Sequence, residues 1–217
     1  MKKIWTLAGD ETSWPDWASR MATSSASELV RQLASEFKPG SHKWAIDIGC
    51  GTGRSFLPLA QNDYQVIGID PIYKAVKAAN ERAKKEHMPA WSILAIANHL
   101  PVRSQSIGSV FAIGTLFHLS PLELEAALLE IKRVLFVGGE AILHFLDIGD
   151  WRQKLGNSLK SEDVPMPSYQ AVVTCFCSED VIRGMINSAG LSYQDSYLKV
   201  HDDDGGKRKD WFFHCVR

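Results

Sequence analysis

The chain has 217 residues, and its 24 lysines and arginines nearly balance its 25 aspartates and glutamates, for a formal net charge of −1. This length favours a single domain, and the balanced charge argues against a nucleic acid bound by bulk electrostatics. No apolar run reaches the roughly 18 residues of a membrane span, and the N-terminal apolar stretch is too short for a signal peptide. We therefore expect a soluble cytoplasmic protein without a membrane partner.

Short apolar runs alternate with helical patterns along the chain, which predicts an α/β domain with a largely parallel sheet. Before the first run, apolar residues at helical spacing predict two helices, or one broken helix, within residues 12–37. Five strands are then expected, at residues 44–48, 66–69, 91–96, 107–113 and 141–146. Helices are expected over about residues 54–61 and from Pro71, Pro121 and Ser178.

The end of the chain has a different pattern. Residues 191–200 and 210–216 are both strand-like, and the Asp202–Gly206 segment between them has the composition of a turn. Because no crossover helix separates these two runs, the pattern predicts a closing antiparallel hairpin.

The most informative stretch is the glycine-rich turn over residues 47–53, Asp-Ile-Gly-Cys-Gly-Thr-Gly, which follows a predicted strand and opens a predicted helix. Glycines let the backbone approach a ligand closely, and a helix N-terminus offers unpaired N–H groups to an anion. A dinucleotide fingerprint would need its third glycine at position 54, where this chain has Arg54. The pattern is therefore G-x-G-x-G.

A second signal is Asp70, which lies 17 residues after Gly53 at the end of the second predicted strand. An acid at this place can accept hydrogen bonds from both ribose hydroxyls of an adenosine. The alternative is that Asp70 only caps the helix that begins beside Pro71. The combination with the glycine turn favours ribose binding.

These two motifs resemble those of a known family. Residues 45–53 resemble motif I of the class I S-adenosylmethionine-dependent methyltransferases, and Gly68-Ile69-Asp70 resembles their following acidic motif. Stretches similar to the family continue through residues 100–119 and 133–140. The resemblance implies a Rossmann-like, doubly wound, mostly parallel seven-stranded sheet that ends in an antiparallel hairpin. It also implies S-adenosyl-L-methionine as cofactor and S-adenosyl-L-homocysteine as product.

The resemblance suggests how the chain is organised as one methyltransferase domain. Residues 1–43 would form a helical cap or lid, 44–146 the cofactor-binding core, 147–177 a variable insertion on the substrate side, and 178–217 the terminal helix and hairpin. Within the first segment, two tryptophans either cover the cofactor or pack against the sheet edge; they are Trp14 and Trp17.

The resemblance also implies roles for residues around the methionine part of the cofactor. Asp47, Gly49 and Gly51 would border the methionine carboxylate and amine. Gly114 and Thr115, after the fourth predicted strand, would lie near the methionine and the sulfonium.

On the adenosine side, Asp70 would hold the ribose, and Pro71 or Ile72 would pack on the adenine. Ala97 and Asn98, after the third predicted strand, would line the adenine edge. Many members of the family have an acid after the third strand that binds the adenine amino group. This chain has none, so that Asn98 or a backbone carbonyl would take its place.

Methyl transfer from a sulfonium is an in-line displacement, in which the protein mainly aligns the reacting groups. A base is needed only where the nucleophile must lose a proton. His118, after the fourth predicted strand, is the candidate catalytic base, because a neutral imidazole accepts a proton near pH 7. The alternative is that His118 caps or packs against the helix that starts at Pro121. His144, inside the fifth predicted strand, is expected to be a core histidine with satisfied hydrogen bonds.

We expect no metal site. Cys175-x-Cys177, with Cys50 and Cys215 far away in sequence, does not have the spacing of a zinc site, and a redox pair would favour C-x-x-C. All four cysteines are therefore interpreted as ordinary reduced thiols. The acidic run Asp202–Asp204 precedes two glycines and is interpreted as a solvated turn.

The leading hypothesis is a methyltransferase that acts on an O, N or other nucleophile of a small molecule, as a monomer or homodimer. Residues 114–117 lack the [DNS]-P-P-[YFW] tetrad of the family's amino-DNA branch, which argues against that chemistry. Nucleic acid is not the expected partner, although a tRNA or protein acceptor remains open. The alternatives are a dinucleotide-dependent oxidoreductase, which Arg54 disfavours, and a non-catalytic cofactor- or partner-binding domain of the same fold.

Overall fold

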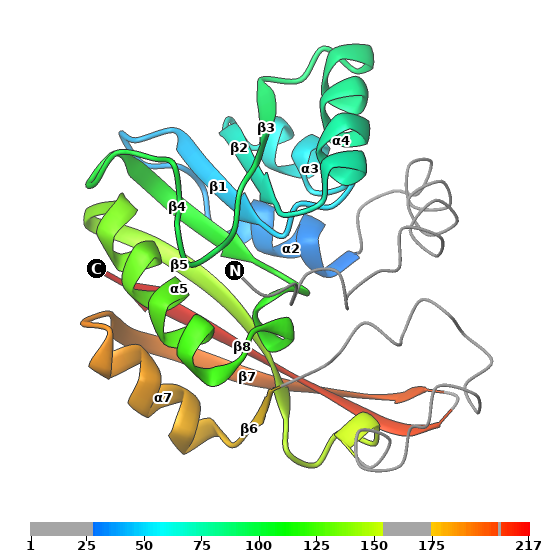
Figure 1. Cartoon of the computed structure of the whole chain (residues 1–217), viewed down its shortest axis with the longest axis vertical. Coiled ribbons are helices and arrows are strands. Elements are labelled where there is room, and N and C mark those ends of the chain that lie inside the picture. Colours follow the sequence, from blue (N-terminus) through cyan, green and yellow to red (C-terminus); the bar gives the residue numbers. More distant parts are fainter. Residues whose placement is uncertain (1–27, 154–174, 204) are drawn as a thin grey trace.

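The computed structural model describes residues 28–153, 175–203 and 205–217. Its centre is one sheet in which seven strands follow the order β3-β2-β1-β4-β5-β8-β7, and a short strand β6 pairs with the end of β5 (Figure 1). The strands are β1 Trp44–Ile48, β2 Gln65–Asp70, β3 Ala90–Leu94, β4 Ile107–Ala112, β5 Leu135–Asp147, β6 Phe176–Cys177, β7 Ser192–Asp203 and β8 Gly206–Val216. Strands β1 to β5 run parallel, and β8 lies antiparallel to both β5 and β7. The expected seven-stranded sheet with its closing hairpin is confirmed.

Helices cover both faces of this sheet. They are α2 Glu28–Glu36, α3 Phe56–Gln61, α4 Tyr73–Lys85, α5 Pro121–Val134 and α7 Glu179–Ser188, with a short 3-10 helix, η1, over Leu116–His118. Helices α2, α3 and α4 pack on one face against Ala45 and Phe111. Helices α5 and α7 pack on the other face against Ile46 and Val110. The neighbouring residues of each strand thus enter opposite cores, which explains why β1 and β4 are apolar along most of their length.

The start of α5 confirms a local sequence signal. The Ser120 side chain accepts a hydrogen bond from the Glu123 backbone N–H, and the Glu123 carboxylate accepts one from the Ser120 backbone N–H at 2.9 Å. Pro121 occupies the first helical turn. This reciprocal capping satisfies two N–H groups that the helix itself leaves unpaired.

Strand β5 differs from its expected bounds, because it starts at Leu135 instead of residue 141. Gly138 and Gly139, which the sequence places in a turn, lie inside this strand. Gly138 has a positive φ of 84°, and its N–H donates to the carbonyl of Arg217 at the end of the chain. Pairing with β4 is also irregular between Ile107 and Ser109. The two glycines therefore accommodate a distortion of a longer strand rather than a chain reversal.

Three sets of predictions lie outside the described residues: those for Trp14 and Trp17, those for the helical pattern and cap before residue 28, and most of those for residues 147–177. Within the described ranges, no helix is long and apolar enough to cross a membrane.

Candidate cofactor and acceptor site

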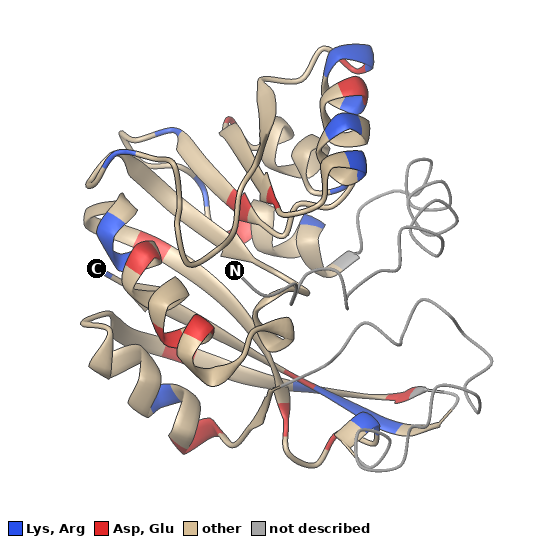
Figure 2. Ribbon diagram, viewed as in Figure 1, with Lys and Arg blue, Asp and Glu red and all other residues tan. Residues whose placement is uncertain are grey.

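The candidate site lies where three neighbouring parallel strands end. Strand β1 is hydrogen-bonded to β2 on one side and to β4 on the other, so the loops that follow these strands emerge side by side. In open α/β sheets, the crevice beside such a change of strand order is where ligands bind. Acidic residues lie among the central strands in Figure 2, whereas the outer helix α4 carries several lysines and arginines.

The turn after β1 is bonded directly to the end of β2. The N–H groups of Gly49 and Cys50 donate to the carbonyl of Ile69 at 2.7 and 3.1 Å. The N–H of Gly51 donates to Oδ2 of Asp70 at 2.9 Å, and the N–H of Ile72 donates to Oδ1 at 2.9 Å. Asp70 therefore joins the glycine turn to the start of α4, and each of its oxygens retains a lone pair for a ligand.

The Asp70 carboxylate is only 6% exposed. Burial raises its pKa to about 6, although the two bonds from Ile72 and Gly51 act in the opposite direction. The bond to Ile72 shows that Asp70 also fixes the turn before α4. The local role and the ribose-binding role are thus compatible, because they use different lone pairs of the same carboxylate.

Asp47, near the end of β1, is also buried, at 2% exposure. Its Oδ2 has no hydrogen-bond partner in the part of the chain that the structure describes. Burial is the main reason that its pKa rises to about 7; a hydrogen bond with Ser55 lowers it and the charge of Asp70 raises it further. A buried carboxylate oxygen without a partner fits a cationic ligand group, such as the amine of S-adenosylmethionine.

The glycine turn is also packed against the loop that follows β4. A Cβ atom placed on Gly49, whose φ is +72°, would lie 2.4 Å from Cβ of Thr115. Gly114 has a φ of +79°, and a Cβ atom there would meet no atom within 4 Å. Glycine is therefore required at position 49 by close packing as well as by its backbone angle, whereas Gly114 is required by the angle and borders open space.

A hydrogen bond to His144 of β5 holds the loop that follows β4. The Gly114 N–H donates to Nδ1 of His144 at 3.0 Å, and Nε2 of the same ring lies 3.0 Å from Oδ1 of Asp210. Since Nδ1 accepts, Nε2 carries the proton and donates to Asp210. Burial lowers the pKa of His144 more than Asp210 raises it. The ring stacks on Phe212 at 4.5 Å, and the prediction of a core histidine with satisfied hydrogen bonds is confirmed.

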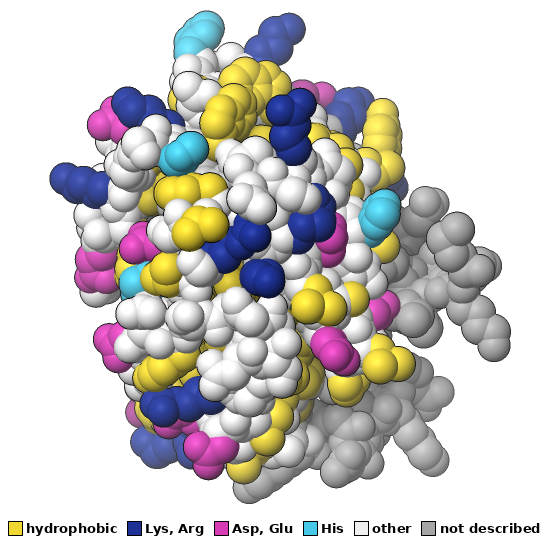
Figure 3. Space-filling model, turned by 90° about the vertical axis from the view of Figure 1, so that its left-hand side faces the viewer, with side chains coloured by type: hydrophobic (Ala, Val, Ile, Leu, Met, Phe, Trp, Pro, Cys, Tyr) yellow, Lys and Arg dark blue, Asp and Glu magenta, His cyan; other side chains and the backbone are white. Residues whose placement is uncertain are grey.

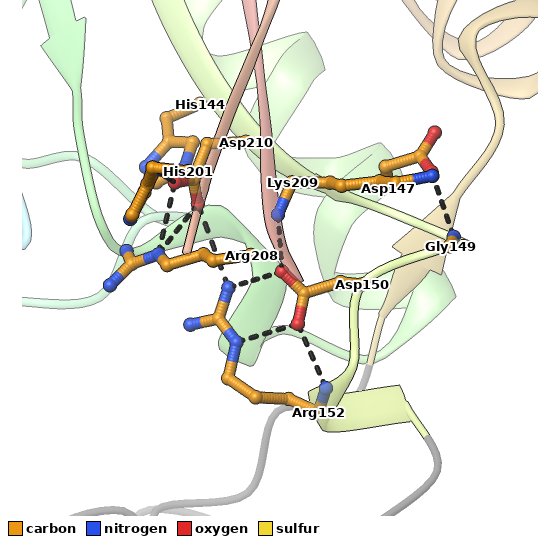
Figure 4. A network of polar contacts seen from close by, with 9 residues as sticks. All are labelled: His144, Asp147, Gly149, Asp150, Arg152, His201, Arg208, Lys209 and Asp210. Atoms are coloured by element: carbon orange, nitrogen blue, oxygen red, sulfur yellow. Dashed lines mark hydrogen bonds and ion pairs between the residues drawn. The ribbon is translucent and has the colours of Figure 1, made fainter. Parts of the chain in front are cut away.

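Asp210 belongs to a charged network that the sequence did not predict (Figure 4). It accepts a hydrogen bond from Arg208 at 2.9 Å and lies 3.6 Å from Nη2 of Arg152. Arg152 in turn donates two hydrogen bonds to the carboxylate of Asp150, at 2.8 and 2.7 Å. Asp210 is 66 residues away from His144 in the sequence, and only the register of β5 against β8 brings the two together. The network thus links the loop after β4 to the segment after β5.

The residues expected around adenine follow β2 and β3. Pro71 adjoins Asp70 and is half-buried. The N–H of Ala95 donates to the carbonyl of Asp70 at 3.2 Å, which holds the loop after β3 beside the end of β2. Ala97 in that loop is 8% exposed, and Asn98 is half-buried. The structure therefore brings the two chain segments together, while contacts with adenine stay a prediction.

His118 is the last residue of η1 and is half-buried. Its ring lies 4.5 Å from that of Phe117, which meets His144 edge-on at 5.2 Å. It therefore lies at the same end of β4 as Gly114, three residues before α5 begins at Pro121. This position is compatible with a base and with a packing role. Among the described residues, no group of three or more His, Cys, Asp or Glu side chains could hold a metal ion.

The fold is that of a Rossmann-like domain. The glycine turn and Asp70, which is bonded to it, fit an adenosine-containing cofactor. Comparisons with known proteins narrow this class. Residues 46–143 match a family model described as "Methyltransferase domain". A tRNA U34 carboxymethyltransferase of Ectopseudomonas mendocina is 34% identical over 118 residues, which are 52% of this chain and 35% of that protein. The O-methyltransferase cnsE of Penicillium expansum is 32% identical over 119 residues, 53% of this chain and 42% of that protein.

Solved structures share the fold over most of the chain. A SAM-dependent methyltransferase of Methanosarcina mazei is 18% identical, with a TM-score of 0.69 over 89% of this chain and 99% of that one. The YcgJ protein of Bacillus subtilis is 15% identical, with a TM-score of 0.70 over 87% of this chain and 97% of that one. The match over residues 46–143 identifies this part of the chain as a class I S-adenosylmethionine-dependent methyltransferase domain, whose methyl donor is S-adenosylmethionine. It spans about two fifths or less of the length of these curated relatives.

Proposed function

We propose that this chain transfers the methyl group of S-adenosylmethionine to an O, N or other nucleophile of a small molecule. The observation that carries this proposal is the Asp70 carboxylate, fixed by the N–H groups of Gly51 and Ile72 beside the glycine turn. A carboxylate held in this way is preorganised to accept two hydroxyl donors of a ribose, because its orientation is set before the ligand arrives.

Further residues would contact the methionine part of the cofactor. Asp47 would face the methionine amine with its unpartnered oxygen, and the backbones of Gly49, Gly51 and Gly114 would border the methionine part. When bound, S-adenosylmethionine supplies a methyl group that its sulfonium already activates. The protein then has to hold the donor, orient the acceptor and exclude water.

On the adenine side, Pro71 would pack on the ring, and Ala97 and Asn98 would line its edge. The hydrogen bond between Ala95 and the Asp70 carbonyl supports this assignment, because it keeps the loop after β3 next to the ribose-binding acid. His118 would act as general base for acceptors that must lose a proton, since it lies at the end of β4 beyond Gly114.

A small-molecule acceptor is supported by the balanced charge of the chain and by the likeness to a fungal O-methyltransferase. Figure 3 shows the side of the molecule that carries the C-terminus, near the start of β5 and thus at the opposite end of the sheet from the candidate site. There, lysine and arginine side chains lie among hydrophobic and acidic ones. A tRNA acceptor is the second candidate, because of the likeness to tRNA U34 carboxymethyltransferases.

Calorimetry with S-adenosylmethionine, S-adenosylhomocysteine, NAD and NADP tests the cofactor assignment. We expect micromolar binding of S-adenosylmethionine and S-adenosylhomocysteine alone; binding of NAD or NADP alone would overturn the cofactor assignment.

The acceptor is tested with S-adenosylmethionine that carries a labelled methyl group. This donor is offered with a metabolite extract free of protein and nucleic acid, or with total tRNA. Label in the small-molecule fraction supports the proposal, and label in tRNA alone replaces it with the second candidate.

A further inference from the structure

The two cysteines of the C-x-C sequence lie unusually close together. The Sγ atoms of Cys175 and Cys177 are 3.0 Å apart, about 1 Å more than the roughly 2.05 Å of a disulfide bond. Both side chains are free thiols. Although the sequence spacing predicts ordinary thiols, the geometry brings the two sulfur atoms to within about 1 Å of the length of a disulfide bond.

The backbone on both sides of this pair is fixed. The N–H of Cys175 donates to the carbonyl of Phe117 at 3.2 Å, which connects it to η1. Cys177 lies in β6 and pairs in register with Asp147 of β5. Cys175 is half-buried, whereas Cys177 is 8% exposed. An approaching reagent therefore meets Cys175 first, and Cys177 lies behind it.

The environment also distinguishes the two thiols chemically. A hydrogen bond from Cys177 lowers the pKa of Cys175 to about 7, against a smaller opposing effect of burial. The same interaction raises the pKa of Cys177. Burial raises the pKa of Cys215 to about 12 and that of Cys50 as well. At neutral pH, Cys175 is thus the thiol with the largest thiolate fraction, which is the reactive form.

We propose that Cys175 and Cys177 form a redox-active dithiol, which a small-molecule disulfide such as oxidised glutathione converts reversibly into an intramolecular disulfide. The short distance between the two sulfur atoms and the partial exposure of Cys175 are the observations that support thiol exchange. This inference does not depend on methyl transfer.

The reaction balances in two exchanges. The Cys175 thiolate attacks one sulfur of oxidised glutathione, a mixed disulfide forms, and glutathione thiolate leaves and takes up a proton. Cys177 then loses its proton, and its sulfur attacks Sγ of Cys175 and releases a second glutathione. The two protein thiols are oxidised to one disulfide, and one molecule of oxidised glutathione is reduced to two of glutathione. Excess reduced glutathione reverses both steps.

The test is the full-length protein in glutathione buffers of graded ratio, quenched with acid, unfolded and alkylated. We expect two of the four thiols to become protected in oxidising buffer, with a mass lower by two hydrogen atoms and with Cys175 and Cys177 in one disulfide-containing peptide. Reduced glutathione should restore all four. Full alkylation in oxidising buffer, or disulfides between two chains only, would overturn the proposal.

Single substitutions separate the two roles. Cys177→Ser keeps the attacking thiol and removes the resolving one, so a stable mixed disulfide with one glutathione should accumulate on Cys175. In Cys177→Ala, which removes the hydrogen-bond donor to the thiolate altogether, alkylation of Cys175 at pH 7 should be about tenfold slower than in the wild type. The matched control Cys215→Ala should form the same intramolecular disulfide as the wild type. Equal behaviour of Cys177→Ser and Cys215→Ala would contradict the assignment.

Discussion

Buried carboxylates in two regions of the sheet have pKa values that are shifted in opposite directions. At the ends of β1 and β2, Asp47 and Asp70 have no arginine or lysine bonded to them in the described structure, and burial raises both pKa values. Around the end of β5, Asp150 and Asp210 are equally buried. There, hydrogen bonds and charges from arginines and His144 outweigh burial and hold both pKa values below the ordinary range.

This difference separates a ligand site from a structural one. Arg152 and Arg208 compensate the charge of the acids beside β5, and the Nε2–H of His144 donates to Asp210, so these acids have their partners within the protein. The ionised forms of the acids beside β1 and β2 are disfavoured by burial, which fits the proposal that a ligand with hydroxyl or cationic groups binds there. The comparison therefore predicts loss of stability from substitutions of Asp150 or Asp210 and loss of cofactor binding from substitutions of Asp47 or Asp70.

The largest effect is expected for Asp210→Ala. The change leaves Arg208 and the Nε2–H of His144 without their acceptor, and removing one partner of a buried ionic network typically costs about 3–5 kcal/mol. Urea unfolding of the ligand-free protein should show this loss. A conserved unfolding midpoint would mean that the network does not stabilise the fold.

His118 lies between the two regions, and its substitution tests the proposed removal of a proton from the acceptor. His118→Ala should lower turnover by about 10²-fold if the imidazole removes a proton from the acceptor, while the affinity for S-adenosylmethionine stays the same. Initial rates and calorimetry measure the two quantities separately. A loss of thermal stability with a proportional loss of turnover would instead assign His118 to packing against α5.

Asp70→Ala should weaken S-adenosylmethionine binding by about 1.5–3 kcal/mol, because hydrogen bonds to a charged group are lost. Calorimetry gives this value directly, and Glu81→Ala on the solvent side of α4 is the matched control for loss of an acid. Unchanged affinity in Asp70→Ala would remove the ribose assignment.

The smallest effect is a pH dependence that follows from the raised pKa values. Acids whose pKa is about 6 to 7 in the folded protein and near 4 in the unfolded chain bind protons more tightly when folded. Their contribution to the stability of the ligand-free protein is therefore fully present below about pH 4 and is lost as the pH rises through 7. Binding of a cationic cofactor should strengthen over the same range.

This dependence is measured by urea unfolding at several pH values for the wild type and Asp47→Asn. The asparagine variant cannot ionise at this position, so the difference in stability between the two proteins should change between pH 5 and 8. A difference that is constant with pH would show that Asp47 is not protonated in this range.

Local signals in the sequence were sufficient for the first region. The hydrogen bond between Gly51 and Asp70 joins residues that are only 19 positions apart in the sequence. The glycine turn and Asp70 each lie at the end of an apolar run. The capping box at Ser120 is local as well. Adjacent strands in a βαβ arrangement bring such loops together without further information, and for this reason the pairing of the glycine turn with Asp70 could be predicted from the sequence.

The second region depends on register and side-chain rotation. The amino-acid sequence by itself determined the strand order at the cofactor side, the glycine turn with its acid and the closing hairpin, because each depends on neighbours within one supersecondary unit. Only the tertiary structure decided that β5 begins at Leu135, that His144 meets Asp210 across 66 residues, and that the two C-x-C sulfur atoms converge. The first two features depend on which residues of distant strands lie opposite each other, because a shift of one residue directs each side chain to the other face of the sheet. The third depends on side-chain rotation, since the two cysteines are only two residues apart.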